Sequence, residues 1–131
     1  MFVLSSVILA LIFPPKIEPV LLDTNLQRAE ILRVSTDLPK IGNWWRAPKG
    51  VHKMTIHVEA KNTETMLFWL IPTGTQTWGQ RELIGYDIDG RDGWSLTWKF
   101  DNRVLHDHIH VQAIGEETVS NSSINVTTDF P

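Results

Sequence analysis

Two short stretches carry side chains that could bind a metal ion. The first is acidic and rich in glycine, residues 87–93 (DIDGRDG). Its carboxylates, Asp87, Asp89 and Asp92, supply the hard oxygen ligands that calcium prefers. A helix-loop-helix calcium loop, however, has acids at positions 1, 3 and 5, glycine at 6 and glutamate at 12. Counted from Asp87, positions 5, 6 and 12 are instead arginine, aspartate and tryptophan. An irregular calcium site stays open, but aspartate and glycine are also the residues that a tight turn requires.

The second stretch, residues 106–110 (HDHIH), contains three histidines at alternate positions. In an extended chain His106, His108 and His110 share one face, with successive Cβ atoms about 6.6–7 Å apart. Imidazoles are ligands for zinc and copper, and a carboxylate or a water molecule could complete such a site. The alternative is a solvent-facing row opposite the apolar residues of a strand. We favour that row, because three ligands from one flat strand rarely converge on a tetrahedral centre.

Six tryptophans in 131 residues form a third group of candidates. Trp44, Trp45 and Trp78 lie in segments that predict loops. Exposed aromatic rings can stack on sugar faces or anchor a protein partner, so these three are candidate ligand-binding residues. Alternatively, their rings fold back and cover the ends of the domain. The other three lie in predicted strands and are expected in the core: Trp69, Trp94 and Trp98.

Several classes of function are disfavoured by what the sequence lacks. It contains no nucleophile elbow and no His-Glu-x-x-His motif, so we expect no catalytic residues, no cofactor and no enzymatic activity. With no cysteine, disulfides, thiolate catalysis and cysteine-ligated zinc are excluded. The net charge of −3 gives no basic surplus for neutralising phosphates, so nucleic acid is not an expected partner.

The elements that would position these residues are strands. Apolar residues alternate with polar ones in most segments, while residues 66–71 (MLFWLI) form a continuous apolar run typical of a strand covered on both faces. Residues 37–50 contain two prolines and two glycines and predict a loop. Residues 29–35 fit either a helix or a strand, and we favour the strand. The expected strands are residues 29–35, 54–60, 66–71, 81–87, 94–100, 108–113 and 118–127.

Six or seven short strands separated by turns, without a long helix, predict an all-β sandwich or a small barrel. Residues 83–100 (LIGYDIDGRDGWSLTWKF) place the acidic turn between two of these strands. We interpret this stretch as a β-hairpin rather than as an ion site.

The order of the segments also resembles a known family. Five segments carry the resemblance: residues 55–60 (TIHVEA), 66–70 (MLFWL), 83–87 (LIGYD), 94–98 (WSLTW) and 108–113 (HIHVQA). Together they are similar to the bacterial immunoglobulin-like domains over about residues 50–128. The resemblance implies an antiparallel β-sandwich of about seven strands with loops exposed at its ends. It also implies a spacer or an adhesive, ligand-binding module on a secreted or surface protein, without catalytic residues.

The first thirteen residues (MFVLSSVILALIF) are apolar and uncharged, and two prolines follow them. They are too few to cross a bilayer, which takes about 20 residues. Their length suits the apolar region of an export signal, although no basic residue precedes them and no Ala-x-Ala site follows. A buried strand or helix is the alternative. We expect residues 1–15 to be a signal-like or anchor-like segment, and residues 16–131 to be one extracytoplasmic or cell-surface domain. Its expected partner is a glycan or protein, with a pure spacer or a metal-binding module as the alternatives.

Overall fold

The computed structural model describes residues 27–129, and the predicted export or anchor segment lies outside this range. The described chain is all-β, as the alternation of apolar residues predicted. In chain order its elements are β2 (Glu30–Thr36), β3 (Lys40–Ile41), β4 (Trp44–Ala47), β5 (Lys53–Lys61), β6 (Thr65–Pro72), the one-turn 3₁₀ helix η2 (Trp78–Gln80), β7 (Glu82–Asp87), β8 (Trp94–Lys99), β9 (His106–Ile114) and β10 (Val119–Thr128).

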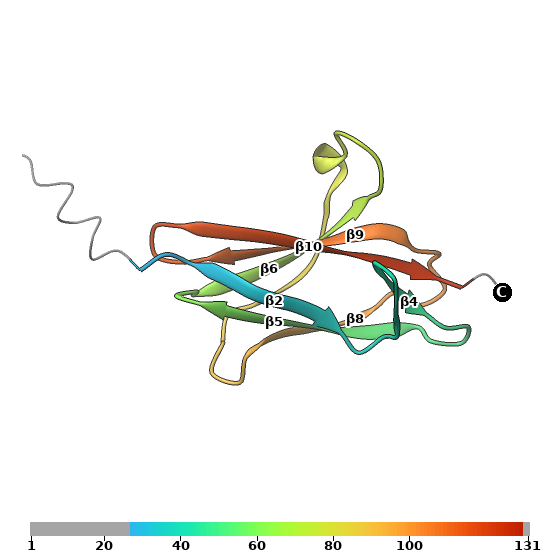
Figure 1. Cartoon of the computed structure of the whole chain (residues 1–131), viewed down its shortest axis with the longest axis horizontal. Helices are drawn as coiled ribbons and strands as arrows, with labels where there is room; N and C mark the ends of the chain where they lie inside the picture. The colour runs from blue at the N-terminus through green and yellow to red at the C-terminus, as the bar shows by residue number, and fades with distance from the viewer. Residues whose placement is uncertain (1–26, 130–131) are drawn as a thin grey trace, which may run out of the picture.

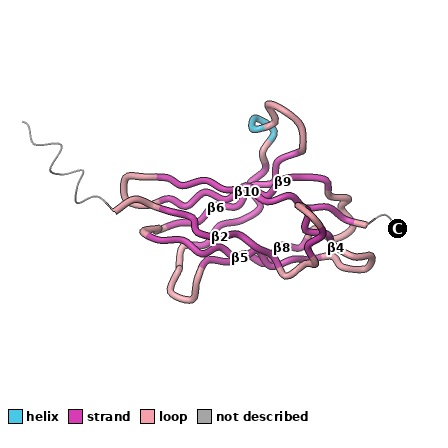
Figure 2. Tube along the Cα trace, in the orientation of Figure 1, coloured by secondary structure: helices cyan, strands magenta, loops and turns pink. Residues whose placement is uncertain are grey.

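The strands form two packed sheets (Figures 1 and 2). One sheet has six strands in the order β3-β4-β10-β9-β6-β7, and the other has three in the order β2-β5-β8. Neighbouring strands are antiparallel except β4 and β10, which run parallel with Trp44 opposite Asn125 and Ala47 opposite Thr128. The prediction of a sandwich-like arrangement is confirmed, but the described residues contain nine strands rather than about seven.

The two additional strands come from residues 37–50, for which the loop prediction is wrong. Gly42 turns the chain with a φ of 62°, and this lets β3 and β4 pair as a short hairpin. Trp45 then packs against the core and Ala47 is 1% exposed. The loop prediction counted the prolines of this segment but not their positions. They flank the hairpin instead of interrupting it, so both strands can form.

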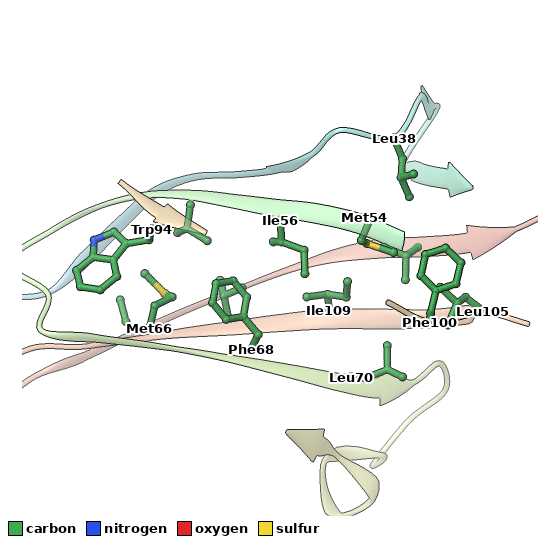
Figure 3. Close-up of a cluster of buried hydrophobic side chains, with 14 of the residues drawn as sticks. Leu38, Met54, Ile56, Met66, Phe68, Leu70, Trp94, Phe100, Leu105 and Ile109 are labelled. Carbon is green, nitrogen blue, oxygen red and sulfur yellow. The ribbon is translucent and has the colours of Figure 1, made fainter. Parts of the chain in front are cut away.

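The core lies between the two sheets (Figure 3). In β5 and β6 alternate residues point into it, as the period of two requires. Those on β5 are Met54, Ile56 and Val58, and those on β6 are Met66, Phe68 and Leu70. Residues 29–35 were correctly predicted as a strand: it pairs with β5 as β2, with a register shift at Leu32.

The continuous apolar run in β6 is not covered equally on both faces. Trp69 was expected in the core but is half-buried and belongs to the opposite face, because its neighbours Phe68 and Leu70 point inward. Phe68, and not Trp69, is therefore the aromatic residue of β6 that is buried in the core. The other two strand tryptophans agree with the prediction: Trp94 is in the core and Trp98 packs against it.

The hairpin prediction for residues 83–100 is wrong, although the strand-turn-strand pattern is present. β7 pairs with β6 in the six-stranded sheet, whereas β8 pairs with β5 in the other sheet. The acidic turn thus carries the chain from one sheet to the other. Gly90 is needed there, because a Cβ at this position would lie 2.3 Å from the Trp94 ring.

Candidate functional site

The outer face of the six-stranded sheet, the one turned away from the three-stranded sheet, holds most of the candidate residues. On β9 and β10 the inward residues Ile109, Val111, Ala113 and Val126 are fully buried, so the alternate residues point outward. Apart from Ile114 and Val119, which pair where β9 turns into β10, the outward residues of these two central strands are imidazole, amide and hydroxyl side chains, namely His106, His108, His110 and Gln112 on β9 and Asn121, Ser123, Asn125 and Thr127 on β10.

One group on this face is centred on Trp78. Its ring centroid is 4.9 Å from that of His110 at 68°, and 6.1 Å from that of Trp69 at 59°. The guanidinium carbon of Arg81 lies 4.5 Å from the Trp78 ring centroid and 5.0 Å from that of Trp69. Trp69 Nε1 donates a hydrogen bond of 2.7 Å to Gln112 Oε1. We call these five residues the Trp78 cluster.

The Trp78 cluster brings β6 and the segment that follows it together with β9, which is distant from both in sequence. Residues 73–81, which include η2, stand out from the sandwich on the side of the six-stranded sheet (Figure 1). This brings Trp78 next to β6 and β9, and its side chain stays 42% exposed. The sequence alone identified Trp78 but not Arg81 or Gln112. The spacing of three residues between Trp78 and Arg81 was an available signal, because one 3₁₀ turn brings such residues onto the same side.

Trp44 lies on the same outer face, in β4. Its ring stacks on His106 at 4.5 Å with an interplanar angle of 16°. Beside it, His108 Nδ1 is 2.7 Å from Asn125 Oδ1, and Asn125 Nδ2 donates to the carbonyl of Asn43 at 3.1 Å. These contacts fix the outward side chains of β4, β9 and β10.

The Trp45 side chain lies on the opposite face of β4 from Trp44. It packs against the core, and the Lys40 ammonium lies 5.3 Å from its ring centroid. Of the three tryptophans predicted in loops, Trp44 and Trp45 are therefore in a strand and Trp78 is in a 3₁₀ turn. Trp44 and Trp78 share the outer face, and Trp45 does not.

The three histidines share one face of β9, but each has its own neighbours. His106 stacks on Trp44, His108 contacts Asn125, and His110 lies against Trp78 with its Nε2 3.0 Å from Asn121 Oδ1. In residues 27–129, no group of three histidine, cysteine, aspartate or glutamate side chains is arranged so that it could hold a metal ion.

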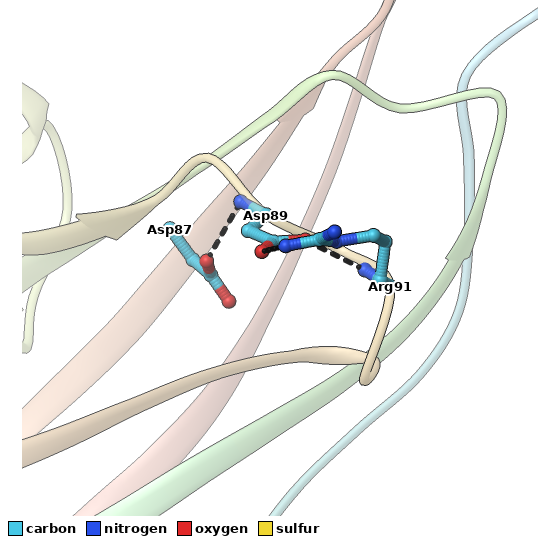
Figure 4. Close-up of polar contacts among 3 residues, drawn as sticks. All are labelled: Asp87, Asp89 and Arg91. Atoms are coloured by element: carbon cyan, nitrogen blue, oxygen red, sulfur yellow. Dashed lines mark hydrogen bonds and ion pairs between the residues drawn. The ribbon is translucent and has the colours of Figure 1, made fainter.

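The carboxylates of the acidic turn bond to their own loop (Figure 4). Asp87 accepts hydrogen bonds of 3.0 Å from the backbone N–H of Asp89 and from that of Ser95. Asp89 accepts from Arg91 three times: from the backbone N–H at 3.1 Å, from Nε at 2.9 Å and from Nη2 at 2.6 Å. The third predicted ligand, Asp92, is exposed. These bonds account for Asp87 and Asp89 as turn-forming residues.

The Arg91 side chain holds the pKa of Asp89 below its ordinary value of 3.8. Because the folded-state pKa is lowered, the pair stabilises the fold above the unfolded-state pKa, and this contribution disappears as the pH falls through the folded-state value. We expect the carboxyl ¹³C signal of Asp89 to titrate with a midpoint below 3.8, and Arg91→Gln to raise that midpoint. Arg103→Gln, which removes the partner of Glu82, serves as the control and should leave it unchanged. A midpoint insensitive to Arg91→Gln would contradict the pairing.

Two surface hollows lie elsewhere on the molecule. One, of about 430 Å³, lies between residues 48–52 and 100–104, and the other, of about 480 Å³, borders the acidic turn. Neither is lined by a residue of the Trp78 cluster. The cluster is thus separate from both hollows, and its Trp78 is exposed.

No protein-family model matches the chain, and no curated protein matches it in sequence. Among residues 27–129 the structure contains no helix with the length and apolarity that crossing a membrane requires.

Proposed function

We propose that the chain is a non-enzymatic, extracytoplasmic immunoglobulin-like module that binds a surface ligand through the outer face of its six-stranded sheet. The observation that carries this proposal is the Trp78 cluster: an indole 42% exposed, supported by a second indole and a guanidinium. Rigid aromatic side chains of this kind supply much of the binding energy at protein and glycan interfaces. The extracytoplasmic location rests on the apolar residues 1–13.

The order of the strands supports the immunoglobulin-like part of the proposal. In such domains strands A, B and E lie side by side in one sheet, and strands C, F and G form the other. The order β2-β5-β8 matches A-B-E, and β6-β9-β10 matches C-F-G, with β7 at the position of a C′ strand. The described chain differs in the outward direction of Trp69, since immunoglobulin domains bury a tryptophan on strand C.

The residues proposed for binding are Trp44 and Trp78. Trp45, which the sequence analysis grouped with them, supports the core instead. The competing function is a structural spacer, in which the contacts of Trp44 with His106 and of Trp78 with His110 serve only to stiffen the sheet.

The test is to screen the full chain against arrays of glycans and of extracellular proteins, alongside Trp78→Ala and Trp44→Ala. We expect Trp78→Ala to weaken the binding of the strongest probe more than about tenfold, because an anchoring aromatic contributes at least about 2 kcal/mol. Leu32→Ala is the matched control, because Leu32 is 51% exposed on the other sheet. It should bind like the native chain.

Thermal unfolding of the same variants separates the two functions. A binding module predicts lost binding with a small change in melting temperature. Lower melting temperatures for Trp44→Ala and Trp78→Ala, with no probe bound by the native chain, would instead favour the spacer.

A further inference from the structure

Among residues 27–129, Arg81 is held in place without an acidic partner. Its guanidinium lies over the rings of both Trp69 and Trp78, which are themselves neighbours, and Nη1 donates a hydrogen bond of 3.1 Å to the carbonyl of Trp78. Arg46, Arg91 and Arg103 each form an ion pair, whereas Arg81 has none within residues 27–129, and its Nε and Nη2 have no hydrogen-bond partner there. A guanidinium already fixed in position loses little freedom when it binds a planar anion.

The charge around Arg81 also favours an anion. The whole chain has a net charge of −3, yet no outward position of β6, β9 or β10 is an aspartate or glutamate. The nearest acid in sequence, Glu82, is paired with Arg103 at 3.0 Å. Beyond β10, Asp129 is paired with Arg46 at 3.2 Å. Within the part of the chain that the structure describes, the positive charge of Arg81 is therefore not neutralised by an ion pair.

The neighbours of Arg81 suit a sugar. The exposed indole of Trp78 offers a flat apolar surface for the C–H face of a pyranose ring. Gln112 uses its Oε1 to accept from Trp69, and Asn121 has its Oδ1 beside His110. Within the described residues their amide NH₂ groups have no partner, so both can donate to hydroxyl or carboxylate oxygens. An exposed indole beside free amide donors fits one unit of a longer saccharide chain.

From these contacts, and resting on the binding function proposed above, we infer that the Trp78 cluster is a subsite for a carboxylate-bearing sugar of an acidic glycan. Trp78 stacks on the sugar ring and Arg81 pairs with its carboxylate through the Nε and Nη2 edge. Gln112 and Asn121 donate hydrogen bonds to the hydroxyl groups. One guanidinium matches one carboxylate, as found on uronic acids and on sialic acids alike.

The test is to titrate the full chain with trigalacturonate, with 3′-sialyllactose and with neutral cellotriose, followed by tryptophan fluorescence and by NMR. We expect at least one of the two acidic saccharides to bind more than about tenfold more tightly than cellotriose, which corresponds to about 1.4 kcal/mol. Raising the salt concentration from about 0.05 to about 0.5 M should weaken that binding, because the ion pair is exposed. Which acidic saccharide binds identifies the source of the carboxylate.

Variants of Arg81 and of an ion-paired arginine complete the test. Arg81→Gln should reduce the affinity for the acidic saccharide to that for cellotriose, and Arg81→Lys, which keeps the charge without the planar fork, should reduce it several-fold. Arg91→Gln, at the acidic turn, is the matched control and should bind normally. Melting temperatures within a few degrees of the native value establish that the variants are folded.

Two results would overturn the inference. Equal binding of cellotriose and of the acidic saccharides, unchanged by Arg81→Gln, would remove the carboxylate subsite but leave the proposed binding module standing. Binding of none of the three saccharides would also reject it, and the protein array would then decide the proposed function separately.

Discussion

Replacing Phe68 with alanine is expected to lower the free energy of unfolding by about 3–5 kcal/mol, the usual cost of removing a buried phenylalanine ring. Phe68 is 0% exposed and lies in the middle of the core, on the central part of β6 (Figure 3). Its strand has neighbours on both sides, Val111 on β9 and Gly85 on β7. The backbone there cannot collapse easily, so a cavity would remain.

Urea denaturation followed by tryptophan fluorescence would measure this loss. Leu67→Ala is the matched control, because Leu67 is the preceding residue of the same strand but is only half-buried, on the outer face. Its loss should be less than half as large. Equal losses in the two variants would mean that the assigned direction of β6 side chains is wrong.

Gly115→Ala is expected to destabilise the fold by about 1–3 kcal/mol, the range found when a packed site is overfilled. A Cβ on Gly115 would lie 2.5 Å from the backbone carbonyl oxygen of Asn62 and 3.2 Å from the Cβ of Ala29. Backbone atoms cannot move aside as the end of a flexible side chain can. The turn between β9 and β10 would have to separate from the turn between β5 and β6, where Glu64 N–H donates to the carbonyl of Ile114 at 2.8 Å.

Gly79→Ala provides the comparison for this prediction. A Cβ on Gly79 would meet nothing within 4 Å, so alanine there should be neutral or slightly stabilising. Thermal unfolding of the two variants under one set of conditions is sufficient. If both glycines tolerate alanine equally, the close approach of the two turns is not present in solution.

Much of the fold could be predicted from the sequence, because the alternation of apolar and polar residues indicates which side chains of each strand face the core. Met54, Ile56 and Val58 point into the core as their spacing predicted. Alternation does not say which sheet a strand joins, and this is why β7 and β8 were wrongly paired as a hairpin. Alternation also gives no answer where both faces of a strand carry apolar residues, so the local sequence does not indicate whether Trp69 or Phe68 faces the core. The packing of η2 beside Trp69 is what makes the outer position suitable for an indole.

The candidate site was predictable only in part, for a related reason. Trp44 and Trp78 could be identified as unusual residues outside the main apolar strands, and both lie on the outer face. The partners of the Trp78 cluster depend on contacts between distant segments. Gln112 is 43 residues from Trp69 in sequence, yet the two share a hydrogen bond because β6 and β9 are neighbours.

The parallel pairing of β4 with β10 has a mechanical consequence. In Figure 1 the described chain enters at one end of the sandwich and leaves at the opposite end, and β10, with which β4 pairs in parallel, runs along that direction. If residues 27 and 129 were pulled apart, the hydrogen bonds between β4 and β10 would be loaded in shear. These hydrogen bonds would share the force and break together rather than one after another. Tension along the length of the sandwich would thus be carried by β4 and β10, while the pairing of β6 with β9 keeps its arrangement.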